Sequence, residues 1–359
     1  MKKPLQFQDI PFEETLPEEP PAPALADLFG KTPVKRKGAW KYWGASSLQG
    51  LINTGTHQLL AASPFGFVTA FGRHLSHAAR IRFQNRIFAK RIARNLFALQ
   101  PELKNNPAEQ RKSLVRWWQN ISSTLAEFAK ANTIWTRGRI TVHGREHLEA
   151  AKALGGPLVI VSMHLGTWEA AFTAFHLDLA PPCTGPFQPE PCRFKNRIVY
   201  NLRRKRNQYL FPPGQKSAFR LHRLLTGGAA NLMIFIDEMR DNQIYLPLFG
   251  RPVPDAGNGV VAIKLANAAG GTILPVYLRR KGSRFDLIIE PPLAPSSDAK
   301  TRYPVEETLH RLNDVFEPVV LRDIEHWYML SELRLPEGFE NDQARQDHIA
   351  RLRARADER

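Results

Sequence analysis

Between residues 139 and 321 the sequence alternates short runs rich in β-branched residues with longer amphipathic stretches, and this pattern restricts the possible folds more than any other feature. Alternating strands and helices are typical of an α/β domain with a largely parallel sheet. We therefore expect a mixed, largely parallel central sheet flanked by helices. The strands are predicted at 139–143, 158–163, 182–187, 208–211, 231–237, 272–280 and 284–290, with a short extended run at 244–249.

Composition divides the chain into four regions. Residues 1–30 are acidic and rich in proline, so we expect a disordered tail. Residues 31–132 are predicted to form a basic, amphipathic helical region that associates with membranes. Residues 133–335 form the α/β domain, and residues 336–359 are a charged tail that is either a solvated helix or disordered.

The net charge and the cysteine content limit the classes of function. Fifty Lys and Arg residues against 34 Asp and Glu residues give a formal charge of +16, which favours an anionic partner such as a membrane surface, an acidic carrier or a nucleic acid. The sequence has no recognisable nucleic-acid-binding motif, and we expect no nucleic acid as a partner. Two cysteines argue against a disulfide framework and against a structural zinc site.

The stretch from Tyr42 to Gly72 contains no Asp, Glu, Lys or Arg. It is long enough to span a bilayer, which needs about 20 apolar residues. Polar residues such as Gln49 and Asn53, together with Pro64, make it a poor transmembrane helix. We expect a helix or helical hairpin that lies in a membrane interface or packs on the domain. Residues 73–97 then mix arginines with apolar residues, which is typical of a helix on a membrane surface or on RNA.

The apolar run Leu158–Met163 ends at His164, and Glu169 follows five residues later. This places the histidine at the carboxyl end of a strand, where open α/β sheets usually carry their chemistry. Gly166 permits the tight turn between strand and helix. We predict that Glu169 holds and polarises His164, which acts as a general base on a substrate hydroxyl. A histidine that only caps a helix, with Glu169 in the first turn, fits the same spacing.

Four further residues are candidate substrate contacts. Arg197 and Arg203 lie on a very basic predicted helix at 193–206 and could bind phosphate groups, although a solvated basic face explains them equally. Asp237 ends a strand at the same kind of edge as His164. It could fix a substrate hydroxyl or pair with Arg240, or it could simply begin a turn.

The segment Val161–Glu169 resembles the signature of the lipid A biosynthesis acyltransferases, which include the lauroyl and myristoyl transferases. Thr167 stands where that family commonly has Asn, and Gln188 lies where the family usually has the Arg of an Arg-Pro pair. Glu238 replaces a Gln that follows the family's strand-ending Asp. The resemblance extends from about Arg73 to Tyr328 and includes the segments Asn231–Glu238, Leu246–Pro254, Gly259–Ala269, Thr272–Arg279 and Ile324–Tyr328.

This resemblance implies a glycerolphosphate acyltransferase-like fold of the lysophospholipid acyltransferase superfamily, and an O-acyltransferase activity. The enzyme would move a fatty acyl chain from an acyl carrier protein or coenzyme A thioester to a hydroxyl of a lipid A precursor or a related glycolipid. His164 and Glu169 would be catalytic, and no cofactor or metal would be needed. The implied partners are acyl carrier protein, the glycolipid acceptor and an anionic membrane surface, at the cytoplasmic face of a bacterial inner membrane.

Two alternatives remain open from the sequence. The protein could be non-catalytic and use residues 31–94 to bind membranes or nucleic acid. The chain could also be a degenerate family member with a regulatory role, because Gln188 and Glu238 depart from the family pattern.

Overall fold

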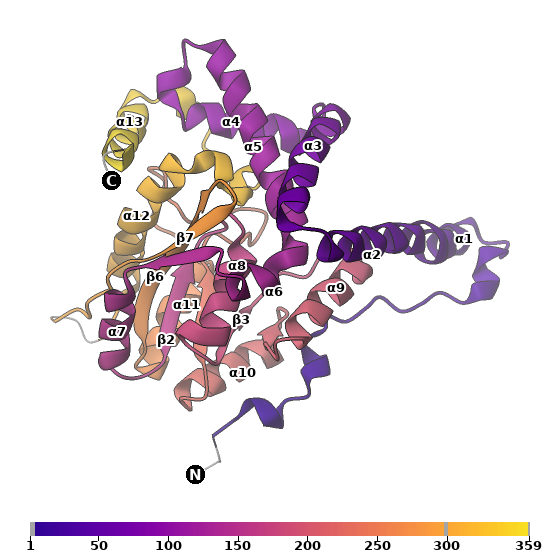
Figure 1. Ribbon diagram of the computed structural model, residues 1–359, viewed down its shortest axis with the longest axis horizontal. Coiled ribbons are helices and arrows are strands. Elements are labelled where there is room, and N and C mark those ends of the chain that lie inside the picture. The colour runs from indigo at the N-terminus through magenta and orange to yellow at the C-terminus, as the bar shows by residue number, and fades with distance from the viewer. Residues whose placement is uncertain (1–3, 298–300, 358–359) are drawn as a thin grey trace.

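The structure is a computed structural model that describes residues 4–297 and 301–357. Its centre is a seven-stranded sheet with the order β1-β7-β6-β2-β5-β3-β4 (Figure 1). All neighbouring strands are parallel except β6 and β7, which form an antiparallel pair, so the predicted mixed, largely parallel sheet is confirmed. The strands are β1 Ile140–His143, β2 Leu158–Ser162, β3 Cys183–Pro186, β4 Leu210–Phe211, β5 Asn231–Phe235, β6 Thr272–Lys281 and β7 Arg284–Ile289.

The central strand β2 is buried on both faces, which explains its unbroken run of apolar residues. Val159 and Val161 join one hydrophobic cluster, whereas Leu158 and Ile160 join a second cluster on the opposite face. Helices cover both faces of the sheet (Figure 1). These helices are α7 Arg145–Ala153, α8 Trp168–Ala174, α9 Arg193–Arg204, α10 Gln215–Thr226, α11 Asn258–Ala269 and α12 Val305–Arg322.

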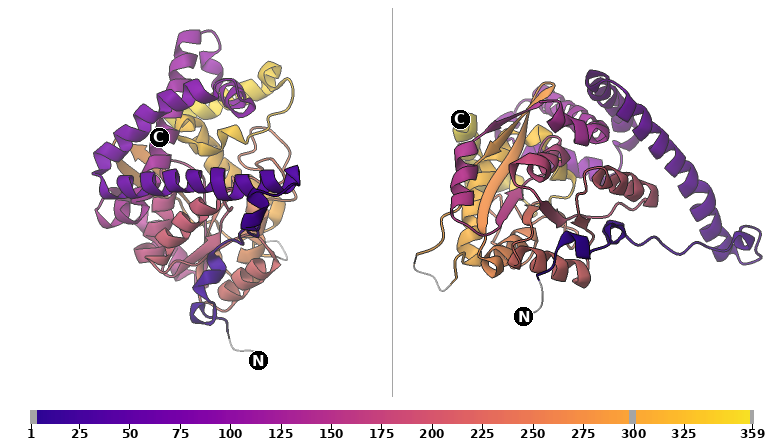
Figure 2. Two further views of the ribbon diagram at one scale, coloured as in Figure 1. Left: turned by 90° about the vertical axis from the view of Figure 1, so that its right-hand side faces the viewer. Right: turned by 60° about the horizontal axis from the view of Figure 1, so that its bottom comes forward.

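The N-terminal part is helical, as predicted, and one section of it projects away from the sheet. Helices α1 and α2 form a long arm that extends away from the domain in Figure 1 and in the right-hand view of Figure 2. None of the helices among the described residues is both long and apolar enough to cross a bilayer. The helices are α1 Pro33–Ala39, α2 Ser46–Ala62, α3 Phe65–Phe83, α4 Ile87–Ala98, α5 Pro107–Glu127 and α6 Ala131–Thr136.

Helix α3 turns back at Pro64 and packs along α5, which joins the arm to the domain. The contact is close at Gly72, where a Cβ atom would lie 2.6 Å from the backbone of Ser122 and Ser123. A larger residue at position 72 would therefore separate the two helices.

The acidic N-terminal segment departs from the expectation of a disordered tail. Residues 4–30 are mostly irregular, with three short 3₁₀ turns, but they pack against the domain. The Phe12 ring contacts the rings of Tyr200 and Tyr209, with centroids 5.3 and 4.8 Å away. Carboxylates of the segment pair with α9 and α10, since Glu19 binds Arg197 at 2.5 and 2.6 Å and Glu14 binds Arg220.

Two other predicted segments differ in detail from the structure. The run 244–249 joins no sheet and ends in a turn at Phe249, whose φ is 48°. Arg251 donates to the carbonyl groups of Ile244, Pro247 and Leu248 and holds the segment as a loop. The charged C-terminal region contains helix α13, Gln343–Asp357, which packs on α12 and buries Ile349 completely.

Candidate active site

The sheet topology brings the residues after β2 and β5 to one edge. These two strands are parallel neighbours with Ser162 opposite Phe235, and the N–H of Ile236 donates to the carbonyl of Ser162 at 2.9 Å. The chain therefore leaves both strands on the same side. His164 comes two residues after the end of β2, and Asp237 comes two residues after the end of β5.

Asp237 is fully buried and binds His164 directly. The Nδ1 atom of His164 lies 2.7 Å from Oδ1 of Asp237, and the backbone N–H of His164 donates to Oδ2 at 2.9 Å. The indole N–H of Trp327 donates to the same Oδ2 at 2.8 Å. An ionised carboxylate only accepts hydrogen bonds, so Nδ1 carries a proton. In the neutral ring this leaves Nε2 with the free lone pair, which is the arrangement a general base requires.

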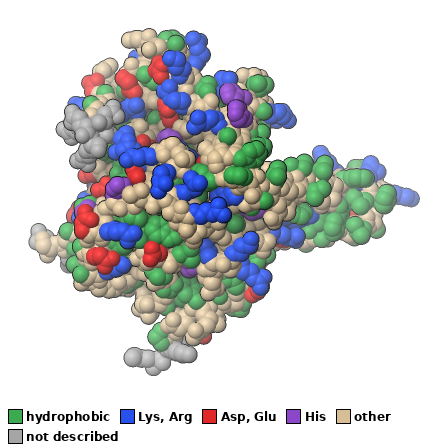
Figure 3. All heavy atoms as spheres, viewed as in Figure 1, with side chains coloured by type: hydrophobic (Ala, Val, Ile, Leu, Met, Phe, Trp, Pro, Cys, Tyr) green, Lys and Arg blue, Asp and Glu red, His purple; other side chains and the backbone are tan. Residues whose placement is uncertain are grey.

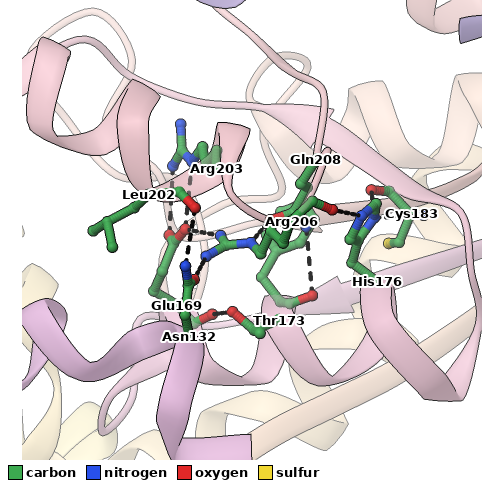
Figure 4. Close-up of polar contacts among 10 residues, drawn as sticks. Asn132, Glu169, Thr173, His176, Cys183, Leu202, Arg203, Arg206 and Gln208 are labelled. Atoms are coloured by element: carbon green, nitrogen blue, oxygen red, sulfur yellow. Dashed lines mark hydrogen bonds and ion pairs between the residues drawn. The ribbon is translucent and has the colours of Figure 1, made fainter. Parts of the chain in front are cut away.

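The predicted contact between Glu169 and His164 is wrong. The Glu169 carboxylate instead accepts hydrogen bonds from Arg203 at 3.3 and 3.4 Å and from Arg206 at 2.6 Å (Figure 4). Two guanidinium groups attract a carboxylate more strongly than a neutral imidazole does, which explains its orientation. Burial alone would raise the pKa of Glu169, but Arg203 and Arg206 outweigh it and lower the pKa to about 2.

The carboxylate of Glu169 is the centre of a buried polar cluster that joins three helices. Arg206 also donates to Gln208 at 2.6 Å and to Asn132, and Asn132 donates to the carbonyl of Leu202 at 3.0 Å (Figure 4). Helices α6, α8 and α9 are thereby tied together immediately beside the segment that carries His164. Glu169 therefore stabilises the surroundings of the base and does not hold the ring itself.

Aromatic side chains and the C-terminal segment fix the position of His164. The imidazole lies 4.5 Å from the ring of Phe235 and 5.1 Å from that of Trp168, measured between centroids. The N–H of Tyr328 donates to the carbonyl of His164 at 3.0 Å, and Leu165 forms a β-bridge with Trp327. The turn at Gly166, with a φ of 55°, occupies the left-handed region that favours glycine.

The charges around His164 favour its protonated form. Burial is the largest single influence and lowers the pKa of the imidazole. Asp237 opposes it through both its charge and its hydrogen bond, and Glu238 and Glu169 add smaller effects in the same direction, so the net pKa lies above the ordinary value. The side chain is 8 % exposed, which means that the ring is largely enclosed but not sealed.

The other predicted substrate contacts are dispersed around this site. Arg203 is buried, with its guanidinium over the ring of Phe187 and against Glu169. Arg197 is exposed on α9 and bound by Glu19. Asp237 does not pair with Arg240, whose partner is Asp241 at 3.7 Å, and both oxygens of the Asp237 carboxylate are already occupied. Its expected role as a substrate contact is therefore replaced by the orientation of His164.

Sequence reasoning named Asp237 as a substrate contact but missed its role in orienting His164, and it gave Trp327 no role in the site. The role of Asp237 could have been found, because it ends a strand at the same edge as His164 and parallel neighbours share an edge. The role of Trp327 had no such signal, since nothing in its local pattern indicates that a residue 90 positions away from Asp237 donates to it.

Within the described ranges, no group of three or more His, Cys, Asp or Glu residues could hold a metal ion. A hollow of about 650 Å³ lies elsewhere, between the strands β6 and β7 and the helices α12 and α13. His143, Tyr277, Arg322 and His348 contribute to its lining, but His164 does not.

The family of the chain follows from its match to known sequences. The sequence model of the bacterial lipid A biosynthesis acyltransferases matches residues 41–334, which include the whole sheet and the site at His164. The chain therefore belongs to this family, and its general activity is that of an acyltransferase of the lipid A type. A search of curated proteins finds no match to the chain.

Proposed function

We propose that this protein transfers a fatty acyl chain from a thioester of acyl carrier protein or coenzyme A to a hydroxyl of a lipid A precursor or a related glycolipid. The observation that supports the proposal best is the contact between His164 and Asp237, which leaves Nε2 as the basic nitrogen. Membership of the lipid A acyltransferase family supports a fatty acyl thioester as the donor and a lipid A precursor or a related glycolipid as the acceptor. A degenerate, regulatory family member would have no need of an oriented imidazole at the sheet edge.

In the proposed reaction, Nε2 of His164 takes the proton of the acceptor hydroxyl. The hydroxyl oxygen attacks the thioester carbonyl carbon, a carbon–oxygen bond forms, and the carbon–sulfur bond breaks. The departing thiolate then takes this proton from Nε2. Asp237 stabilises the imidazolium that exists between these two transfers, as a buried carboxylate does for other catalytic histidines.

The substitution His164→Ala tests the mechanism. We expect thioester consumption by the purified protein to fall by about two to four orders of magnitude, because general base catalysis contributes roughly that much. His176→Ala is a matched control, since His176 is a partly buried histidine that contacts the carbonyl groups of Cys183 and Arg206 instead. Near-normal turnover by folded His164→Ala protein would contradict the mechanism. Mass spectrometry of lipids from cells with and without the protein would identify the acceptor.

We also propose that the projecting arm docks on an anionic membrane surface. Hydrophobic side chains gather along the arm, with Lys and Arg side chains toward its tip (Figure 3). On α2, the positions 48, 51, 52 and 59 share one stripe of the helix, and each carries a Leu or Ile that is at least 59 % exposed. Such a stripe beside basic residues is suited to the interface between lipid headgroups and acyl chains.

Vesicle flotation tests this second proposal. We expect Leu51→Glu to weaken binding to vesicles that contain an anionic lipid, since it places a charge in the apolar stripe. Thr54→Glu is the matched control, because Thr54 is exposed on the same helix but lies off the stripe. Equal binding of the two variants and the unaltered protein would show that the arm does not dock.

A further inference from the structure

The imidazole of His164 lies between two carboxylates. Its Nδ1 atom is 2.7 Å from Asp237, and its Nε2 atom is 3.6 Å from Oε2 of Glu238. The nitrogen that the proposed reaction uses is therefore already facing an acidic group. The Glu238 side chain is 25 % exposed, against 8 % for His164 and none for Asp237, so Glu238 lies on the more open side of the ring.

Glu238 has few other partners. Its Oε1 atom accepts the backbone N–H of Met239 at 3.1 Å. Over residues 4–297 and 301–357, no lysine or arginine forms an ion pair with Glu238, in contrast to Glu169, which is neutralised by Arg203 and Arg206. The groups that face His164 from the packed elements are Asp237 and Glu238 after β5, Glu169 in α8, and the phenol ring of Tyr328, which is 6.3 Å away.

The position of one proton follows from these contacts. Nδ1 donates to Asp237, so a neutral imidazole presents a lone pair at Nε2. This lone pair and an ionised Glu238 carboxylate would repel each other. One proton shared between them removes the repulsion, because the pair then consists of an imidazolium and a carboxylate, or of an imidazole and a carboxylic acid. Burial and the nearby Asp237 raise the pKa of Glu238, although His164 opposes them, and this is consistent with a shared proton.

We propose that Glu238 is a second acid–base group of the active site, which shares the Nε2 proton of His164 and shifts formation of the free imidazole to higher pH. This inference rests on the proposed acyl transfer and adds a residue to it. At a pH high enough to remove the shared proton, both groups are unprotonated before the acceptor arrives. When Nε2 takes the hydroxyl proton, the Glu238 carboxylate stabilises the imidazolium until the thiolate removes that proton, so no extra reactant is needed.

The substitution Glu238→Gln removes the charge and the proton site while preserving the size of the side chain. We expect the titration midpoint of the His164 imidazole, followed by ¹⁵N NMR without substrate, to fall by about one pH unit or more. The low-pH limb of kcat/KM should move in the same direction by the same amount. The rate at high pH should fall by less than about tenfold, because His164 and Asp237 remain in place.

Glu332→Gln is the matched control. Glu332 is a partly exposed glutamate, 30 % by its side chain, close to the Tyr328–Ser331 turn, and it is not among the charges that influence His164. Its loss should leave the His164 midpoint unchanged. Should Glu238→Gln fail to fold, ¹³C titration of the Glu238 carboxyl in the unaltered protein replaces it. The ¹³C shift of this carboxyl should then change at both of the pH midpoints at which the His164 imidazole titrates.

The two readouts separate this inference from the proposed function. A His164 midpoint that is the same in Glu238→Gln and in the unaltered protein would overturn the role of Glu238, even if acyl transfer is observed. A shifted midpoint without any thioester consumption would support the shared proton and refute the acyl transfer.

Discussion

Asp237 binds His164 at two points, with one carboxylate oxygen on the imidazole Nδ1 and the other on the backbone N–H of the same residue. The ring and the main chain of the histidine are therefore held by a single fully buried side chain. A carboxylate in this position sets both the tautomer and the direction of Nε2.

The substitution Asp237→Asn should reverse the tautomer of His164. The backbone N–H of His164 and the indole N–H of Trp327 both donate to Oδ2, so the amide oxygen must occupy that position and the amide NH₂ must face Nδ1. Nδ1 then accepts, and Nε2 carries the proton and cannot act as a base. We expect kcat to fall by about 10²- to 10⁴-fold with little change in KM. Steady-state kinetics and the ¹⁵N shifts of the ring measure both effects.

Trp327→Phe provides the comparison for that variant. It removes one hydrogen bond to Asp237 but leaves the carboxylate and the tautomer intact. We expect a loss of about 1 kcal/mol of stability and a much smaller loss of kcat. If kcat fell equally in Asp237→Asn and Trp327→Phe, control of the His164 tautomer by Asp237 would be contradicted.

The rate of the unaltered protein should rise with pH across a range above 6.5. His164 must be unprotonated to act as a base, and its pKa is raised above the ordinary value of 6.5 because Asp237, Glu238 and Glu169 outweigh the effect of burial. Lower pH therefore protonates the base and slows the reaction. A profile of kcat/KM against pH measures the midpoint, and a low-pH limb centred below 6.5 would contradict this description of the site.

Glu169→Ala should destabilise the fold. The change leaves Arg203 and Arg206 without their shared carboxylate in a buried cluster, and removing one partner of such a group costs about 3–5 kcal/mol. Glu149→Ala breaks an exposed pair with Lys152 and should cost less than about 1 kcal/mol. Chemical denaturation of the two variants gives both values, and similar costs would show that the cluster is not stabilising.

The same cluster predicts how stability changes in acid. The pKa of Glu169 is about 2 in the folded protein and 4.5 as a free side chain, so the folded state favours the ionised form. Its contribution to the free energy of unfolding is complete above pH 4.5 and is lost as the pH falls through about 2. In Glu169→Gln this part of the acid dependence should be absent.

The acidic N-terminal segment should compete with an acidic acyl carrier protein for the basic surface of α9. Glu19→Gln removes the carboxylate that holds Arg197 at 2.5 and 2.6 Å. We expect carrier affinity to rise by up to about fivefold at low ionic strength, because exposed ion pairs contribute about 0.2–1 kcal/mol, and to rise less in added salt. Glu18→Gln removes an equal charge from an exposed neighbour and should have no effect. Fluorescence anisotropy with labelled carrier measures these affinities.

The sheet could be predicted from sequence because its signals are local. The apolar run at 158–163 has the length and composition of a strand, and β2 covers most of it. The loop at 244–249 could not be told from a strand, since its conformation depends on Arg251, whose guanidinium binds three of its carbonyl groups. The packing of residues 4–30 was likewise hidden, because it depends on aromatic and charged partners far along the chain.

For the site, sequence identified the base but gave it the wrong partner. His164 and Glu169 are close in sequence, and spacing can suggest only neighbours of that kind. The true partner, Asp237, is 73 residues away and meets the histidine only through the pairing of β2 with β5. The positions of Arg203 and Arg206, which hold Glu169, depend in the same way on how α9 packs.

The three side chains joined at the Asp237 carboxylate come from the middle, the later part and the last tenth of the chain, and this has a consequence during synthesis. A ribosome-bound chain that has emerged to a few residues beyond β5 contains His164 and Asp237 but lacks the Trp327 indole and the Tyr328 amide that complete the arrangement. An unfinished molecule therefore already carries the imidazole, but that ring acquires its full set of anchors only when the final segment has docked.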